Sequence, residues 1–294
     1  MTDATRLLYT VPLPCGAKLC LGERPLVMGV LNVTPDSFAD ANNRLTDVAR
    51  AVEAAVQMEA DGADIIDVGG ESTRPGAEPV PADEELARVL PVLKALRGRL
   101  RIPLSIDTYK ADVARAAVAE GAAIVNDVSG GQDAGMARAV ADTGAALVLV
   151  HTRGRSRTMY AEAVYRDVVA EVTAELGAGL RRATEAGVPI HGIIVDPGLG
   201  FAKQAPHSYV VLARLPELAS ALHRPVLVGP SRKSFLRDAL AGRPAPDRDW
   251  GTAAAATAAV LGGAHIVRVH AVAEMAQVVR VAEEVRRHHD VAEG

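Results

Sequence analysis

The sequence predicts an α/β fold, a single (β/α)8 TIM barrel with an N-terminal hairpin, and three observations support this prediction. Short apolar runs alternate with longer amphipathic stretches from about residue 26 to the C-terminal end, which is the pattern of repeated βα units. Eight apolar runs have the length of strands, and no clear linker divides the chain. The 294 residues match the size of one such barrel with some insertion. We therefore expect one domain over residues 1–294.

The elements follow in order along the chain. A hairpin is expected at Leu7–Glu23, where Gly16 and Gly22 punctuate alternating residues, and it would cover the N-terminal mouth of the barrel. The stretch Gly242–Asp249 is expected to be an exposed loop before a helix that begins near Trp250. The predicted strands are Leu26–Leu31, Asp64–Val68, Pro103–Ile106, Ala123–Asn126, Ala146–Val150, Gly192–Val195, Pro225–Val228 and Ala264–Val269. Predicted helices between them include Asp47–Asp61, Asp83–Leu96, Asp112–Glu120, Tyr165–Ala186 and Ala271–His289.

Composition excludes several classes of protein. With 49% hydrophobic and 23% charged residues, the chain is neither disordered nor a disulfide scaffold. A net charge of −4 does not favour nucleic acid as a partner. Cys15 and Cys20 lack the second pair that a structural zinc site needs. The first ten residues show no secretory h-region and no apolar run reaches the ~20 residues of a membrane span, so a cytoplasmic location is expected.

Polar residues occur at the point where every predicted strand ends. In this fold the chemistry lies at the C-terminal ends of the strands. A single Asp or Asn at such a point usually caps the next helix, but that explanation is weak for eight positions in register. These residues are Asn32, Gly69–Gly76, Asp107, Asn126–Asp127, His151, Asp196–Phe201, Gly229–Lys233 and Arg268–His270.

Two polar groups are expected at this mouth. Asp107, Asn126 and Asp196 would converge on one cavity with Lys233, and such a set suits a flat heterocycle with many donors and acceptors. A second group, near the closure of the barrel, would suit a phosphate or pyrophosphate, helped by helix N-termini after Ser231 and Gly251. It consists of Asn32, Arg268 and His270. A Mg²⁺ ion held mainly by phosphate oxygens is compatible with so few dedicated ligands.

Several motifs in this order resemble the dihydropteroate synthase family over essentially the whole chain. They are Met28–Phe38 (MGVLNVTPDSF), Asp67–Gly76 (DVGGESTRPG), Ser105–Asp107 (SID), Asn126–Gly130 (NDVSG), Asp196–Lys203 (DPGLGFAK), Ser231–Lys233 (SRK) and Arg268–His270 (RVH). The resemblance implies an enzyme that condenses 6-hydroxymethyl-7,8-dihydropterin pyrophosphate with p-aminobenzoate, giving 7,8-dihydropteroate and pyrophosphate. It also implies Mg²⁺ as cofactor and a homodimer.

The resemblance further assigns roles to single residues. Asp107, Asn126, Asp196 and Lys233 would hold the pterin ring. Asn32, Arg74, Arg268 and His270 would hold the pyrophosphate, with Asn32 also on Mg²⁺. Phe38, Thr73, Pro75 and Ser234 would shape the p-aminobenzoate pocket. The catalytic residues would be Asp107, Asp196, Lys233 and Arg268, acting on an SN1-like loss of pyrophosphate through fixed charges.

The chain departs from the family pattern at two places. Ala39–Asn43 replaces a common Ser-Asp-Gly-Gly, which predicts a less pliant first loop. Val150–Thr152 replaces a common Met-His-Met, so the apolar floor beneath the pterin would be packed differently. The second loop lacks the insertion of sulfonamide-resistant relatives, and we therefore expect sensitivity to sulfonamides.

Two other functions remain open at this point. A methyltransferase that moves the methyl group of methyltetrahydrofolate to a corrinoid protein would share the heterocycle site, although Ser231–Lys233 and Arg268–His270 favour a pyrophosphate-bearing substrate. A catalytically silent paralogue would bind pterin without turnover. A lone histidine after a strand is usually structural, and this is our interpretation of His151.

Overall fold

A ring of eight parallel strands forms the centre of the molecule. The computed structural model describes residues 6–34, 44–72, 76–154, 159–161 and 163–288. Hydrogen-bonded strands follow the order β8-β7-β6-β5-β4-β3-β10-β9. A parallel bridge between Val195 of β8 and Val226, the residue before β9, joins the two ends of this order. The sheet is therefore a nearly closed barrel, which confirms the predicted fold class.

The strand bounds agree with the predicted ones to within two residues at each end. The barrel strands are β3 (Leu26–Asn32), β4 (Ile65–Gly69), β5 (Leu104–Asp107), β6 (Ala122–Asp127), β7 (Ala146–Val150), β8 (Ile193–Asp196), β9 (Leu227–Val228) and β10 (Ile266–Val269). Their mostly aliphatic sequences fit parallel strands that are buried on both faces.

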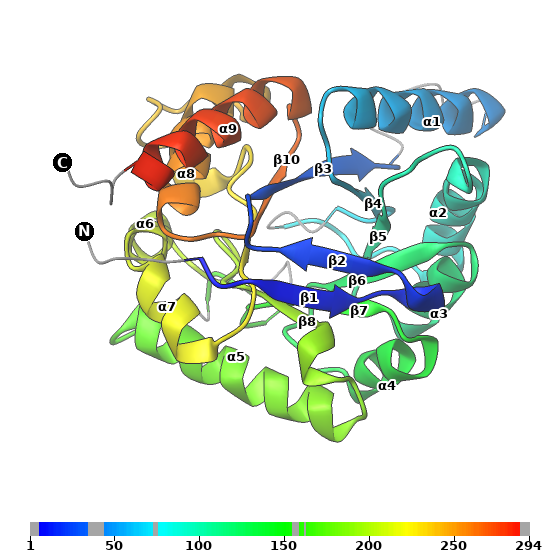
Figure 1. The fold of residues 1–294 in the computed structure, drawn as a ribbon, viewed down its shortest axis with the longest axis horizontal. Coiled ribbons are helices and arrows are strands. Elements are labelled where there is room, and N and C mark those ends of the chain that lie inside the picture. Colours follow the sequence, from blue (N-terminus) through cyan, green and yellow to red (C-terminus); the bar gives the residue numbers. More distant parts are fainter. Residues whose placement is uncertain (1–5, 35–43, 73–75, 155–158, 162, 289–294) are drawn as a thin grey trace.

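Helices surround the barrel, as Figure 1 shows. They are α1 (Arg44–Ala60), α2 (Ala82–Leu96), α3 (Ala111–Ala119), α4 (Ala134–Thr143), α5 (Val168–Glu185), α6 (Ala205–Ala213), α7 (Leu215–Leu222), α8 (Asp249–Leu261) and α9 (Val272–His288). Short 3-10 turns are η1 (Pro14–Gly16), η2 (Ile190–Gly192), η3 (Ser234–Leu236) and η4 (Ala245–Arg248). The sequence prediction of a helical stretch after each strand gave no bounds for α4, α6 and α7. No helix in the described part of the chain is long and apolar enough to span a membrane.

The predicted hairpin lies across the N-terminal end of the barrel, where Figure 1 shows β1 (Tyr9–Pro12) and β2 (Lys18–Leu21) in front of the barrel strands. The two strands pair antiparallel, with Tyr9 opposite Leu21. Side chains of the hairpin, Val11 and Leu19 among them, join one buried cluster with Met28 and Ile65 from the barrel interior. The hairpin therefore closes the bottom of the barrel with apolar side chains.

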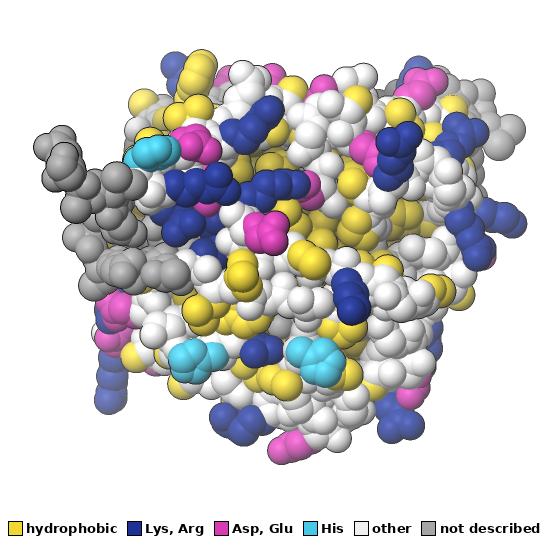
Figure 2. Space-filling model, viewed as in Figure 1, with side chains coloured by type: hydrophobic (Ala, Val, Ile, Leu, Met, Phe, Trp, Pro, Cys, Tyr) yellow, Lys and Arg dark blue, Asp and Glu magenta, His cyan; other side chains and the backbone are white. Residues whose placement is uncertain are grey.

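The same end of the molecule carries a groove, which is separate from the mouth of the barrel. Its volume is about 800 Å³, and it is lined by parts of α1, α9 and the start of β3, including Val27, Ala60 and Val279. Figure 2 shows apolar side chains gathered on this face among Lys and Arg side chains. Arg24 and Asp64 pair at its edge, with 2.9 Å between Arg24 Nη1 and Asp64 Oδ2.

His265, at the start of β10, fastens the chain before the hairpin to the barrel. It is 3% exposed, its Nδ1 accepts from the backbone N–H of Val226 (3.1 Å), and its Nε2 lies 3.0 Å from the Leu7 carbonyl. Because Nδ1 accepts, Nε2 carries the proton and the ring is neutral. Burial lowers the pKa of His265 from its usual 6.5 to about 4.

This pKa shift predicts acid destabilisation. Between pH 6.5 and pH 4 the unfolded chain binds a proton that the folded His265 does not, so stability is present above this window and is lost as pH falls through it. At pH 5 the loss from this group is about 2 kcal/mol relative to pH 7. The free energy of unfolding, measured in urea, should therefore fall less between pH 7 and pH 5 in His265→Asn than in the unchanged protein, by about 2 kcal/mol. The exposed control His288→Asn keeps His265 and should show the same fall as the unchanged protein. An equal fall in His265→Asn and in the unchanged protein would contradict this account.

Candidate active site

Strand alternation places most of the candidate residues on the inner face of the barrel. Residues two apart in a strand point to the same side. Met28, Ile65, Ile124, Ile194 and Ile266 belong to the inner apolar cluster. Further along the same strands and on the same face lie the polar residues Asn32, Asp67, Asn126, Asp196 and Arg268. The barrel interior is therefore apolar towards the hairpin and polar at the C-terminal mouth.

Arg268 is the centre of this polar layer. Its Nε donates to Asp67 Oδ2 and its Nη2 donates to Asp107 Oδ2, both at 2.6 Å. Asp67 is 0% exposed and Asp107 is 7% exposed. Burial works against the charge of Arg268, but the two carboxylates outweigh it and raise the pKa of the guanidinium. A cation held between two buried carboxylates keeps both at fixed positions.

Buried acceptor oxygens face this cluster without a hydrogen-bond partner among the described residues. Asn126 Nδ2 donates to Asp67 Oδ2 at 3.0 Å, which leaves the Asn126 Oδ1 oxygen unpaired. The Oδ1 atoms of Asp67 and Asp107 are also buried and unpaired. Burial raises the pKa of Asp107, Arg268 opposes this rise, and Asp67 adds to it. Unpaired buried acceptors cost free energy unless a ligand donates to them.

Lys233 and Asp196 lie on the β8–β9 side of the same cluster. Lys233 Nζ donates to the Leu199 carbonyl at 2.5 Å and lies 4.3 Å from the centre of the Phe201 ring. Burial lowers the pKa of Lys233 to about 8, while the negative charge of Asp196 opposes that shift. Burial also raises the pKa of Asp196, against Lys233 and the N–H of Gly198, which donates to its Oδ1 at 2.7 Å. The structure thus brings together Asp107, Asn126, Asp196, Lys233 and Arg268.

Asn32 and His270 lie at the rim. A Cβ placed on Gly69 would be 3.6 Å from Asp107 Cβ and 3.7 Å from Asn32 Oδ1, so these two side chains are neighbours. His270 Nδ1 lies 2.8 Å from Ser231 Oγ, which also accepts from the His270 N–H at 3.1 Å. Arg268 contacts Asp67 and Asp107, whereas His270 contacts Ser231. Arg268 therefore belongs to the same cluster as Asp107, and the binding of a phosphate group by Asn32, Arg268 and His270 stays a prediction.

The expected helix N-terminus after Ser231 was wrong. Two short 3-10 turns follow, η3 (Ser234–Leu236) and η4 (Ala245–Arg248), and the first α-helix, α8, begins at Asp249, before Gly251. Pro244 and Pro246 interrupt the intervening chain, since proline cannot donate to a helical turn. The Arg248 guanidinium instead donates to the carbonyls of Arg232 and Lys233, at 3.1 and 3.2 Å. Ser234 is exposed and its Oγ lies 2.8 Å from Tyr160 Oη.

Some predicted residues lie outside the described part of the chain. These are Phe38, Arg74, Thr73 and Pro75, together with Ala39–Asn43. Their roles stay predictions from the sequence.

Sequence reasoning missed Asp67 and Ser231 as site residues. Asp67 interrupts the apolar strand β4, just as Arg268 interrupts β10. A charged side chain inside a buried strand needs a partner, so an acidic and a basic interruption in one barrel could have been paired. Ser231 was noted only as part of the Ser231–Lys233 motif and was given no role of its own, because its contact with His270 depends on the path of the loop after β9.

His151 lies on the outer side of the barrel wall, next to the inward-facing Val150. It is 2% exposed and has a partner on each ring nitrogen, Lys203 Nζ at 2.7 Å and Glu175 Oε2 at 2.9 Å. These contacts agree with the interpretation of His151 as a structural residue.

The fold and this site define a barrel with a polar mouth, and comparison with known proteins identifies the class of protein. The pterin binding enzyme family matches residues 28–270. Dihydropteroate synthase of Synechocystis is 45% identical over 95% of this chain and 96% of its own length. The structure of the Yersinia pestis dihydropteroate synthase with a sulfonamide drug complex has a TM-score of 0.87 and 39% identity, covering 96% of this chain and 100% of that one. The Burkholderia cenocepacia enzyme, complexed with 7,8-dihydropteroate, has a TM-score of 0.85 and 43% identity, covering 96% and 98%.

The chain belongs to the pterin-binding enzyme family, as one of its dihydropteroate synthases.

Asp67 provides a test of how the polar layer is held together. Asp67→Asn removes the negative charge that holds Arg268 Nε but keeps the shape of the side chain. Because hydrogen bonds to charged groups contribute about 1.5–3 kcal/mol, dihydropteroate synthase activity (kcat/KM) should fall by about 10- to 100-fold. Asp112→Asn, on the exposed face of α3, is the matched control and should keep full activity. Normal kcat/KM in a folded Asp67→Asn protein would show that Arg268 does not depend on this carboxylate.

Proposed function

We propose that this chain joins 6-hydroxymethyl-7,8-dihydropterin pyrophosphate to p-aminobenzoate and releases 7,8-dihydropteroate and pyrophosphate. The observation that carries the proposal is a set of buried acceptor oxygens on Asp67, Asp107 and Asn126 that have no hydrogen-bond partner among the described residues, next to the Arg268 guanidinium. A pterin ring carries several N–H donors and ring acceptors in one plane, which suits such a set. Two relatives that are 45% and 43% identical to this chain are named dihydropteroate synthase.

The pterin ring would be held by Asp107, Asn126, Asp196 and Lys233. These side chains come from four strands or strand ends and meet in the polar layer. Asp107 and Asp196 would face the ring with negative charge, and Lys233 would donate to a ring acceptor. Arg268 would lie against the same ring edge, because it is already bound to Asp107.

The pyrophosphate would be held by Arg268, His270, Asn32 and Arg74. A guanidinium has five N–H donors, and two of those of Arg268 bind Asp67 and Asp107. The remaining donors can bind phosphate oxygens, with His270 fixed beside them by Ser231. The p-aminobenzoate pocket would include Phe38, Thr73, Pro75 and Ser234. The exposed Ser234 hydroxyl is placed by Tyr160 and would donate to the carboxylate of p-aminobenzoate.

Fixed charges would carry the chemistry in two steps. The bond between the pterin methylene carbon and the bridging oxygen would break first, and its electron pair would leave with pyrophosphate. Asp107 and Asp196 would stabilise the positive charge left on the pterin, while Arg268 and His270 would stabilise the departing anion. The amine lone pair of p-aminobenzoate would then form the C–N bond, and the nitrogen would lose its proton to solvent or pyrophosphate.

Mg²⁺ fits this site as a partner of the pyrophosphate. The Asn32 carboxamide offers a hard oxygen donor of the kind that Mg²⁺ takes. Within the described ranges, no group of three His, Cys, Asp or Glu residues is placed to hold a metal ion. We therefore propose that Asn32 is its protein ligand and that the other ligands are pyrophosphate oxygens and water. When bound, Mg²⁺ would neutralise charge on the leaving group.

We also propose that the chain is one domain over residues 1–294, that it forms a homodimer and that it is located in the cytoplasm. Trp250 at the start of α8 is 88% exposed, and tryptophan is a residue type enriched at protein interfaces. Cys15 and Cys20 are free and exposed, which suits a reducing compartment.

A direct assay separates this function from its rivals. Purified protein with Mg²⁺, dihydropterin pyrophosphate and p-aminobenzoate should yield dihydropteroate and pyrophosphate in equal amounts. Asp107→Ala should lower kcat by about 100-fold or more, since it removes a fixed charge from the transition state. The exposed Asp142→Ala is the control. Pterin binding without product would indicate the silent paralogue. Methyl transfer from methyltetrahydrofolate to a corrinoid protein would indicate the methyltransferase.

Sulfonamide sensitivity is expected from the same pocket. The Yersinia pestis relative has been solved with a sulfonamide drug, and a sulfonamide resembles p-aminobenzoate in shape and charge. A folate-synthesis mutant that depends on this chain should stop growing in sulfamethoxazole, and added p-aminobenzoate should restore growth. Undisturbed growth at drug concentrations that stop a strain carrying a sensitive enzyme would refute the expectation.

A further inference from the structure

A buried lysine outside the barrel wall joins three parts of the fold. Lys203, 1% exposed, lies at the end of the loop that follows β8. Its Nζ lies 2.7 Å from His151 Nδ1, 3.2 Å from the Gly198 carbonyl and 3.1 Å from the Phe201 carbonyl. His151 in turn contacts Glu175 of α5, with 2.9 Å between Nε2 and Oε2. The reaction proposed above uses none of these three side chains.

These contacts determine which atoms of Glu175, His151 and Lys203 carry protons. Burial would raise the pKa of Glu175, but the hydrogen bonds from His151 and Arg153 lower it to about 2. Glu175 is therefore ionised and can only accept, so His151 Nε2 carries a proton. Burial lowers the pKa of His151 to about 4, which leaves Nδ1 bare. Lys203 must then donate to Nδ1 and to both carbonyls, and although burial lowers its pKa, three donated bonds require the ammonium form.

The loop between Asp196 and Lys203 depends on these bonds for its path. A Cβ on Gly198 would lie 2.0 Å from the His151 carbonyl oxygen, so the loop presses against the end of β7 at a point where only glycine fits. Ala202 is buried at φ 47°, a left-handed conformation that is unfavourable for alanine. The carbonyls of Gly198 and Phe201 accept from Lys203, and the carbonyl of Leu199, one of the two that lie between them, accepts from Lys233.

We propose that Lys203 is a positioning residue for the pterin-ring site: it fastens the Asp196–Lys203 loop to His151 from outside the barrel wall and so sets the places of Asp196 and Lys233. Its ammonium also lies close enough to Asp196 to favour the ionised carboxylate. The proposal rests on the proposed function and adds a residue to it that does not touch the substrate.

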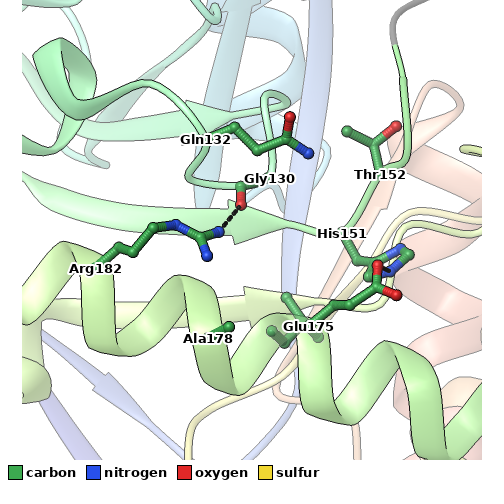
Figure 3. Close-up of a pocket in the computed structure, with 8 residues that line it drawn as sticks. Gly130, Gln132, His151, Thr152, Glu175, Ala178 and Arg182 are labelled. Atoms are coloured by element: carbon green, nitrogen blue, oxygen red, sulfur yellow. Dashed lines mark hydrogen bonds and ion pairs between the residues drawn. The ribbon is translucent and has the colours of Figure 1, made fainter.

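Glu175 completes the arrangement from the outside. A cavity of about 360 Å³ borders it, lined also by His151, Gln132, Ala178 and Arg182. Figure 3 shows the Glu175 side chain reaching from α5 towards the His151 ring, while Arg182 bonds to the carbonyl of Gly130. Arg153 holds the Glu175 carboxylate, with 3.0 Å between Nε and Oε1. Glu175, itself held by Arg153, therefore also holds the orientation of the His151 ring.

Lys203→Met keeps the length of the side chain but cannot donate. It should raise KM for dihydropterin pyrophosphate, and the dissociation constant of 6-hydroxymethylpterin in calorimetry, by about 10- to 100-fold. KM for p-aminobenzoate should stay as in the unchanged protein, because Lys203 acts on Lys233 only through the bond from Lys233 Nζ to the Leu199 carbonyl, and Tyr160 holds the neighbouring Ser234 hydroxyl. Lys94→Met, on the exposed side of α2, is the matched control. Equal pterin affinity in folded Lys203→Met and in the unchanged chain would overturn the proposal.

A second pair of variants decides the matter if Lys203→Met does not fold. In His151→Asn the carboxamide oxygen stands where Nδ1 was and can still accept from Lys203, whereas His151→Ala removes the acceptor. Pterin affinity should be close to normal in His151→Asn and weakened about tenfold in His151→Ala. Equal affinities in the two variants would overturn the proposal. Pterin binding by calorimetry does not need turnover, so a chain that binds pterin but forms no product would count against the proposed function alone.

Discussion

The ion pairs from Arg268 to Asp67 and Asp107 are the constraint on which the rest of the site depends. They cross the interior of the barrel from β10 to β4 and β5, at 2.6 Å each. Two buried carboxylates without a cation would be strongly destabilising, because ionised groups need partners when they leave water. Arg268 satisfies one oxygen of each and leaves the other oxygen buried and unpaired among the described residues. The same interaction therefore stabilises the barrel mouth and leaves acceptors directed at a ligand.

Layering of the barrel interior explains why the site lies at only one end. Towards the hairpin, side chains such as Met28 and Ile65 pack with Val11 and exclude water. At the other end the inward positions carry charge. Electrostatic interactions between fixed groups are stronger where one side of a cavity is apolar. A charged intermediate formed at the polar layer is therefore supported by groups that cannot easily move away, and the apolar layer beneath them keeps solvent from entering from below.

The sequence predicted the barrel, its strands and most of the residues that meet in the polar layer. The alternation of short apolar runs with amphipathic stretches and the position of Asp107, Asn126 and Asp196 at strand ends were sufficient, because parallel strands bring their ends to one edge. Asp67 was missed although it interrupts an apolar strand. The partners of His270 and Lys203 follow from the paths of loops, and loop paths depend on contacts between residues distant in sequence. The short turn after Ser231 was mispredicted for the same reason, since Arg248 binds the carbonyls that a helix would have used.

The central claim is that Asp107, Asn126, Asp196, Lys233 and Arg268 form one binding site for a pterin ring at the mouth of the barrel. The most direct test is a crystal structure of the protein with dihydropterin pyrophosphate. The account predicts ring density in the polar layer, within hydrogen-bonding distance of the Asp107 and Asn126 side chains, with the phosphates towards Arg268 and His270. Density for the ring outside the barrel, or in the barrel with its donors turned away from these carboxylates, would contradict it.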